Sequence, residues 1–159
     1  MSNVSASYFE GGCDCASVRY RMTRKPLFVN CCHCRWCQRE SGSAFALNAL
    51  IEMENVHINS GEIELVDTPS QSGKGQKIAR CPKCRIAVWS HYGGLDKLAF
   101  IRVGTLDEPD LHPPMAHIYT NTKQPWVTLA ADVPAFSAYY KSSEVWPQES
   151  LTRRIALFS

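Results

Sequence analysis

The sequence lacks the long apolar runs and the strong charge bias that mark membrane proteins and many nucleic-acid-binding proteins. No apolar run approaches the ~20 residues needed to span a bilayer. Residues 1–5 contain neither the basic nor the apolar region of a signal peptide. The formal net charge of +2 is nearly neutral, and there is no long basic tail. We therefore expect a cytoplasmic protein that binds neither membranes nor nucleic acid.

Helix signals are also scarce, and most of the chain has a strand-like pattern. Strands are predicted at 18–22, 45–51, 56–58, 62–66 and 97–103. Asn59-Ser60-Gly61 predicts a hairpin turn between the third and fourth of these strands. A short helix is predicted over 36–41, ended by Gly42. The polar stretch 68–75 is expected to be a bare loop, with a mobile flap over a site as the alternative.

The length of 159 residues fits one domain with its own core. The fold class that these patterns predict is mainly β, a single domain (1–159) of antiparallel sheets with little helix. A short closing element is expected between 146 and the C-terminus.

Cysteine is the residue type that carries the functional signal. Seven of the eight cysteines fall into two pairs and one triplet: Cys13 and Cys15, Cys81 and Cys84, and Cys32, Cys34 and Cys37. In a reducing compartment, such groups more often bind metal than form disulfides. Two pairs can close a four-thiolate zinc site that stabilises a fold, whereas three thiolates leave one position of the metal open for chemistry. We therefore expect two zinc ions, one structural and one catalytic.

Strand geometry favours Cys32 over its neighbour Cys31 as a member of the triplet. Successive residues of a strand point to opposite faces, so Cys32 and Cys34 share a phase that Cys31 and His33 do not share. We expect His33 to lie outside the ligand set. The alternative is a second structural zinc whose fourth ligand is His33, His91 or His117.

Charge limits what the open position would accept. Three thiolates and one Zn²⁺ sum to −1, which makes the metal a modest Lewis acid that prefers a soft ligand. Thiol chemistry fits this site better than hydrolysis by a bound water.

Several spaced motifs together resemble the glutathione-dependent formaldehyde-activating enzyme family, which includes centromere protein V. The motifs, in order, are Gly11-Gly12-Cys13-x-Cys15 with Val18-Arg19-Tyr20, Cys32-His33-Cys34-x-x-Cys37, Ser41-Gly42-Ser43-Ala44-Phe45, Cys81-x-x-Cys84, Val103-Gly104-Thr105-Leu106 and His117-Ile118-Tyr119. The resemblance covers a core of about 8–140 and leaves a C-terminal tail at 141–159.

The resemblance implies a fold similar to that of a small guanine-nucleotide-exchange chaperone, with the two zinc sites assigned as above. It also implies a carbon–sulfur lyase that joins formaldehyde and glutathione into S-hydroxymethylglutathione, or splits that adduct. Two positions depart from the family pattern. Ala16 and Arg85 stand where members usually carry glycine, and Ala16 is expected to exclude a backbone conformation that only glycine tolerates.

The expected reaction needs a proton donor and a site for the carboxylates of glutathione. His117 and Tyr119 are the preferred donors because they lie in a resembling motif, and His91 is a further candidate. Arg35 and Arg39 are the candidate glutathione-binding residues, beside Arg102 and Lys123.

Two other classes of function stay open on the sequence. One is a non-catalytic binding or chaperone module stabilised by zinc. The other is nucleic-acid or cytoskeletal association, as the centromere relative suggests. The substrate, the oligomeric state and the role of Cys31 do not follow from the sequence.

Overall fold

The computed structural model describes residues 8–159, and these form ten β-strands in two sheets with three α-helices. Residues 1–5, which were considered above for a signal peptide, lie outside the described range. The small sheet has the order β1–β2–β5, with β1 at Phe9–Gly12, β2 at Arg19–Met22 and β5 at Val56–Ser60. The predicted mainly β class is confirmed.

The large sheet has seven strands in the order β10–β3–β4–β9–β8–β7–β6. Their bounds are Ala116–Ile118 (β10), Phe28–Cys32 (β3), Ala46–Glu52 (β4), Leu98–Arg102 (β9), Ala87–Tyr92 (β8), Gln76–Arg80 (β7) and Glu64–Thr68 (β6). Every pairing is antiparallel except that of β10 with β3, which is parallel.

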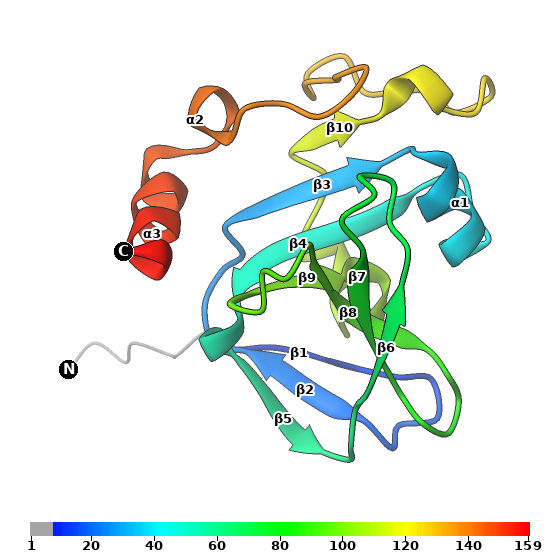
Figure 1. Ribbon diagram of the computed structural model, residues 1–159, viewed down its shortest axis with the longest axis vertical. Coiled ribbons are helices and arrows are strands. Elements are labelled where there is room, and N and C mark those ends of the chain that lie inside the picture. The colour runs from blue at the N-terminus through cyan, green and yellow to red at the C-terminus, as the bar shows by residue number, and fades with distance from the viewer. Residues whose placement is uncertain (1–7) are drawn as a thin grey trace.

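The two faces of the large sheet have different partners. Along β4, Ala49 and Ile51 belong to the main core together with Tyr20 and Met22 of the small sheet. Leu50, which points the other way, packs in a second cluster with Trp146 of the C-terminal segment. Figure 1 shows the small sheet on one side of the large sheet and the C-terminal segment on the other. The second face therefore has room for a site between the sheet and the C-terminal segment.

The hairpin predicted across Asn59-Ser60-Gly61 is wrong. The chain does turn there, since Gly61 has a φ of 83°. However, β5 pairs with β2 in the small sheet and β6 pairs with β7 in the large sheet. A Cβ at Gly61 would lie 2.0 Å from the carbonyl oxygen of Ser17, so the close approach of two backbones also requires glycine here.

The short helix is confirmed as α1 (Arg35–Ser41), with Gly42 in the left-handed conformation after it. The C-terminal tail forms α2 (Ser142–Val145) and α3 (Gln148–Phe158). Arg153 of α3 forms a buried ion pair with Glu52 at the end of β4, with an Nη2–Oε2 distance of 2.6 Å. The tail is thus fixed beside the end of β4 that is remote from α1 (Figure 1).

Within residues 8–159, every helix is too short or too polar to span a bilayer.

Candidate functional site

Four cysteine sulfurs from two distant turns converge at one point. Cys13 and Cys15 lie between β1 and β2, whereas Cys81 and Cys84 lie between β7 and β8. All four sulfur atoms are within 4.8 Å of one another, and Cys15 Sγ is 3.6 Å from Cys13 Sγ and 3.7 Å from Cys81 Sγ. Sulfurs placed about 2.3 Å from a tetrahedral zinc ion are about 3.8 Å apart. The four thiols therefore fit a zinc ion.

Hydrogen-bond donors around this group favour the thiolate form that a metal requires. Ser17 Oγ lies 3.0 Å from Cys15 Sγ and 3.2 Å from Cys81 Sγ, and the backbone N–H of Val18 donates to Cys13 Sγ. The hydroxyl of Ser17 and, after it, backbone N–H groups lower the pKa of Cys81 to about 5.

Both turns of this four-cysteine group contain a left-handed residue that is not glycine. Ala16 has a φ of 59° and Arg85 has a φ of 66°. Their N–H groups bond to the carbonyls of Cys13 and Cys81, which closes each turn. The expectation that Ala16 excludes such a conformation is wrong, because the turn holds it there at a cost of roughly 1–2 kcal/mol. The Arg85 side chain points to Glu64, with which it forms an exposed ion pair.

Three further sulfurs form the triplet where β3 meets α1. Cys32 is the last residue of β3, Cys34 caps α1 and accepts the N–H of Cys37 at 3.3 Å, and Cys37 lies in the first turn. All three are buried, with sulfurs within 4.8 Å of one another. Within residues 8–159, no histidine joins this group. Three convergent thiols without a fourth protein ligand fit a zinc ion with one open position.

Hydrogen bonds within the triplet favour the thiolate form of Cys34. The thiols of Cys32 and then Cys37 donate to its sulfur and lower its pKa. Backbone N–H groups at the start of α1 act in the same direction. The triplet is therefore prepared to bind a cation even before all three thiols ionise.

Cys31, His33 and His117 lie on the opposite face of β3, as strand alternation predicts for the first two. In the parallel register His117 is level with Cys31, and Ile118 is level with Cys32. His33 Nε2 is 2.9 Å from His117 Nδ1 and 3.6 Å from Cys31 Sγ, and all three residues are buried. Burial lowers the pKa of His33 to about 4 and also lowers the pKa of His117. The two neutral rings therefore share a hydrogen bond with each other.

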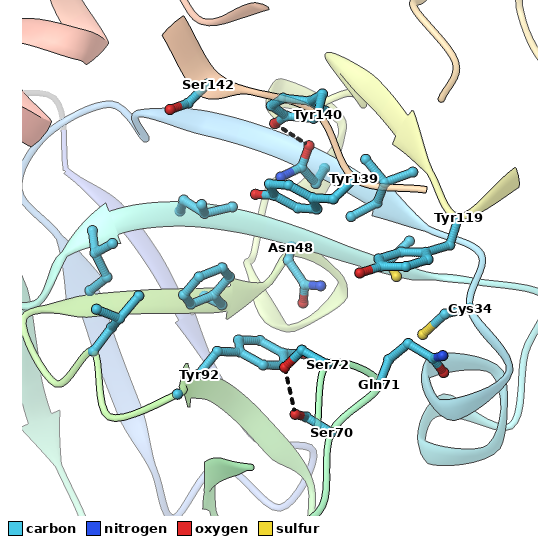
Figure 2. A pocket seen from close by; sticks show the side chains of 18 of the residues that line it. Cys34, Asn48, Ser70, Gln71, Ser72, Tyr92, Tyr119, Tyr139, Tyr140 and Ser142 are labelled. Carbon is cyan, nitrogen blue, oxygen red and sulfur yellow. Dashed lines mark hydrogen bonds between the residues drawn. The ribbon is translucent and has the colours of Figure 1, made fainter. Parts of the chain in front are cut away.

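A cavity of about 640 Å³ lies against the triplet on the face that carries Cys32. Its floor is the large sheet, one wall is the 70–74 loop, and the other wall is the C-terminal segment from Tyr139 to Trp146. Figure 2 shows Cys34 at one end, Asn48 on the floor, Ser70, Gln71 and Ser72 on one side, and Tyr139 and Tyr140 on the other. The 68–75 connector, expected to be a bare loop, therefore forms part of the cavity wall.

Of the predicted proton donors, Tyr119 lines this cavity. Its hydroxyl points into the cavity, on the side of Asn48 (Figure 2). Burial, and then the charges of the triplet thiols, raise the pKa of Tyr119. The structure places His117 in the cluster with His33 instead, and His91 Nδ1 lies 2.6 Å from the carbonyl oxygen of Leu98 in the core. Of the three predicted donors, Tyr119 is thus the one that lines the cavity beside the triplet.

The predicted glutathione-binding arginines lie elsewhere. Arg35 and Arg39 line a separate surface hollow of about 310 Å³ together with Gln38 and Trp126. Arg102 is not among the residues that line the cavity, and its guanidinium donates to Asn48 Oδ1 at 2.5 Å. Lys123 Nζ is bonded to two backbone carbonyls.

Sequence reasoning missed most of the cavity. Three of its lining residues lie on strands, and the sequence does not say which side of those strands faces the cavity: Asn30, Asn48 and Tyr92. Tyr139, Tyr140 and Trp146 come from the tail, where the density of aromatic residues was the one available signal.

Comparisons with known proteins support the family resemblance. The family model described as "Glutathione-dependent formaldehyde-activating enzyme" matches residues 8–122. No curated protein matches the chain. Among solved structures, the chain is similar to a Rhodobacter sphaeroides protein from a structural genomics programme, with 19% identity and a TM-score of 0.49, over 66% of this chain and 96% of that one.

Proposed function

Because the chain belongs to the glutathione-dependent formaldehyde-activating enzyme family, we propose that it is a zinc-dependent carbon–sulfur lyase. It joins a glutathione-type thiol to a small aldehyde such as formaldehyde, or splits the S-hydroxymethyl adduct. The observation that supports this most directly is the buried triplet, whose one open side faces a cavity of about 640 Å³.

Zinc held by Cys32, Cys34 and Cys37 would supply a Lewis acid that accepts the substrate sulfur and favours its thiolate form. The protein residues around it supply position and the proton. In the joining direction, a bond forms between sulfur and the aldehyde carbon, and the carbonyl π pair moves to oxygen. Tyr119 donates its hydroxyl proton to that oxygen, and the proton that leaves the thiol restores the tyrosine.

The raised pKa of Tyr119 determines its protonation state at neutral pH. A tyrosine whose pKa lies above its ordinary value is protonated at neutral pH and can donate. In the splitting direction the same group receives the hydroxyl proton as the carbon–sulfur bond breaks.

The four-cysteine group holds the second, structural zinc in this proposal. We also propose that the protein works in the cytoplasm, because all eight cysteines are unpaired and both metal groups need reduced thiols.

A direct test measures adduct formation from glutathione and formaldehyde, together with zinc content, in the wild type and in Cys34→Ser. We expect the variant to fold, to retain one zinc instead of two and to lose activity by about a thousandfold, since one ligand of the open site is gone. Cys31→Ser is the matched control, because Cys31 lies on the other face of β3.

A folded Cys34→Ser that keeps one zinc and full activity would show that the triplet is not the catalytic centre. A wild type with two zinc ions and no activity on any thiol–aldehyde pair would favour the binding-module alternative.

A further inference from the structure

The cavity floor is ordered in three bands that cross neighbouring strands. Cys32 pairs with Ala46, which forms a sulfur band. Asn30 pairs with Asn48, which pairs with Arg102. The third band consists of the paired residues Phe28, Leu50 and Phe100. Residues two apart on a strand share a face and lie about 6.6 Å apart along it. The second and third bands are therefore about 7 and 13 Å from the first.

The middle band presents amide N–H groups. Asn30 and Asn48 are 3% and 4% exposed and both line the cavity. Asn30 Oδ1 accepts the hydroxyl of Tyr140 at 2.7 Å, and Asn48 Oδ1 accepts the guanidinium of Arg102 at 2.5 Å. Because both amide oxygens are occupied, the NH₂ groups remain as donors for a carbonyl or carboxylate oxygen in the cavity.

The third band is apolar. Leu50, Leu98 and Phe100 form the floor there, and Trp146 forms the wall. The indole ring of Trp146 stacks on Phe28, and its N–H donates to the hydroxyl of Tyr140. Cations border this apolar floor: Arg154 and Lys141 also line the cavity, and the Arg154 guanidinium carbon lies 5.6 Å from the centroid of the Trp146 ring. The floor formed by Leu50, Leu98 and Phe100 has no polar side chain, so it suits an alkyl or aryl group.

We propose that the thiol substrate of this site is amphipathic. It has the thiol at one end, an amide or carboxyl oxygen about 7 Å from the sulfur, and an alkyl or aryl tail that extends over Leu50, Phe100 and Trp146. The reaction of this substrate rests on the function proposed above, but the prediction that it binds does not. N-acylated aminothiols have the required order of groups.

The test compares the binding of three thiols to the zinc-loaded protein by calorimetry: N-octanoylcysteamine, N-acetylcysteamine and glutathione. The first two share the thiol and the amide and differ by six methylenes. We expect N-octanoylcysteamine to bind at least about a hundredfold more tightly than N-acetylcysteamine, since each buried methylene contributes about three- to fourfold. N-ethyloctanamide has the tail and the amide but no thiol. It should bind more weakly than N-octanoylcysteamine and more tightly than N-ethylacetamide.

Variants locate the tail. Phe100→Ala removes a half-buried ring from the apolar band and should reduce the preference for the octanoyl chain about tenfold. Leu95 is an exposed residue of the cavity lining. Adding Leu95→Lys to Phe100→Ala should reduce the preference for the octanoyl chain further. Ile86→Lys, at a similarly exposed apolar position outside the cavity lining, should leave the preference unchanged. Asn30→Asp keeps the acceptor for Tyr140 but removes the amide donors, and it should weaken every amide-bearing probe alike.

Two outcomes would overturn the proposal: equal affinity for the octanoyl and acetyl probes, or tighter binding of glutathione than of either. The proposed function fails in a different way. If the octanoyl preference holds and no adduct forms or splits, the amphipathic site stands and the lyase does not. If glutathione and formaldehyde turn over with no preference for a tail, the lyase stands and the amphipathic site does not.

Discussion

The two cysteine groups both present sulfur atoms that could bind a metal, but they are assembled from the chain in opposite ways. The four-cysteine group joins turns at 13–15 and 81–84, which belong to different sheets, so a metal there ties distant parts of the chain together. The triplet comes from one stretch, 32–37, that is already shaped by the end of β3 and the start of α1. The sequence separation of the cysteines therefore distinguishes the two groups. A metal in the four-cysteine group would stabilise the fold, whereas a metal in the triplet would bind to a site that the fold has already formed.

The surroundings of the two cysteine groups also differ. The four-cysteine group is formed by two turns closed by left-handed residues, whereas the triplet lines a cavity with a tyrosine hydroxyl nearby. Four variants, taken from the largest expected effect to the smallest, test how far this division holds.

Loss of one ligand from the four-cysteine group should have the largest effect. We expect Cys81→Ser to be unfolded or nearly so, because structural zinc in small domains contributes on the order of 10 kcal/mol, comparable to the whole stability of a domain. Circular dichroism and zinc content measure this. Cys31→Ser, a buried cysteine outside both groups, should stay folded. A Cys81→Ser protein with a native melting temperature would remove the distinction between the two groups.

On the triplet side, an ion pair rather than a metal fixes the cavity wall. Arg153→Met should lower the unfolding free energy by about 3 kcal/mol at pH 7, because it leaves the buried Glu52 carboxylate without a partner. Lys141→Met breaks an exposed pair with Glu144 and should cost less than about 1 kcal/mol.

The pH dependence of this ion pair has a definite sign. Burial tends to raise the pKa of Glu52, but hydrogen bonds from Arg153 outweigh it, and the pKa is lowered. The stabilisation is therefore complete above the ordinary carboxyl pKa of about 4.3 and is lost as the pH falls below it. The difference between wild type and Arg153→Met in denaturant unfolding should shrink between pH 5 and pH 3, each taken as a rough limit. A difference that grows on acidification would contradict this assignment.

Replacing Tyr119, the proposed proton donor, should lower the rate without changing the structure. Tyr119→Phe should lower kcat about a hundredfold at unchanged zinc content, the lower end of the range for a general acid. Tyr92→Phe, which also removes a hydroxyl from the cavity lining, is the control. Equal losses in both variants would mean that hydroxyls matter here only for cavity shape.

The smallest effect should be a gain. Ala16→Gly relieves a left-handed alanine and should raise the unfolding free energy by about 0.5–1 kcal/mol, after the greater freedom of glycine in the unfolded chain is counted. Ala87→Gly, at a strand position without positive φ, should lower it by a similar amount. If both substitutions destabilise, the turn at Ala16 carries no strain.

Local signals predicted the local features of this fold. The alternation at Val18, Tyr20 and Met22 and the glycine after α1 depend on near neighbours, and both predictions are confirmed. The cysteine spacing likewise divided seven cysteines into two groups. In the structure the sulfur atoms of each group lie within 4.8 Å of one another. The hairpin at 59–61 failed because a turn signal does not say which strands pair after the turn.

The site was predictable only where its chemistry was local. Cys32, Cys34 and Cys37 are six residues from end to end, but the cavity beside them needs Asn48, Tyr92 and Tyr140 from three other parts of the chain. His117 and Tyr119 are two residues apart in sequence, and a strand would place them on one face. The end of β10 at Ile118 and the left-handed backbone of Tyr119 separate them.

The C-terminal wall of the cavity has a consequence for how this protein could diverge. The family match ends at residue 122, whereas Tyr139, Tyr140 and Trp146 lie beyond it. All seven metal-group cysteines lie before that boundary. Mutation or exchange of the last forty or so residues can therefore change which molecules enter the cavity while all seven cysteines stay intact. Selection can therefore change substrate choice through the C-terminal wall almost independently of the chemistry at the cysteines.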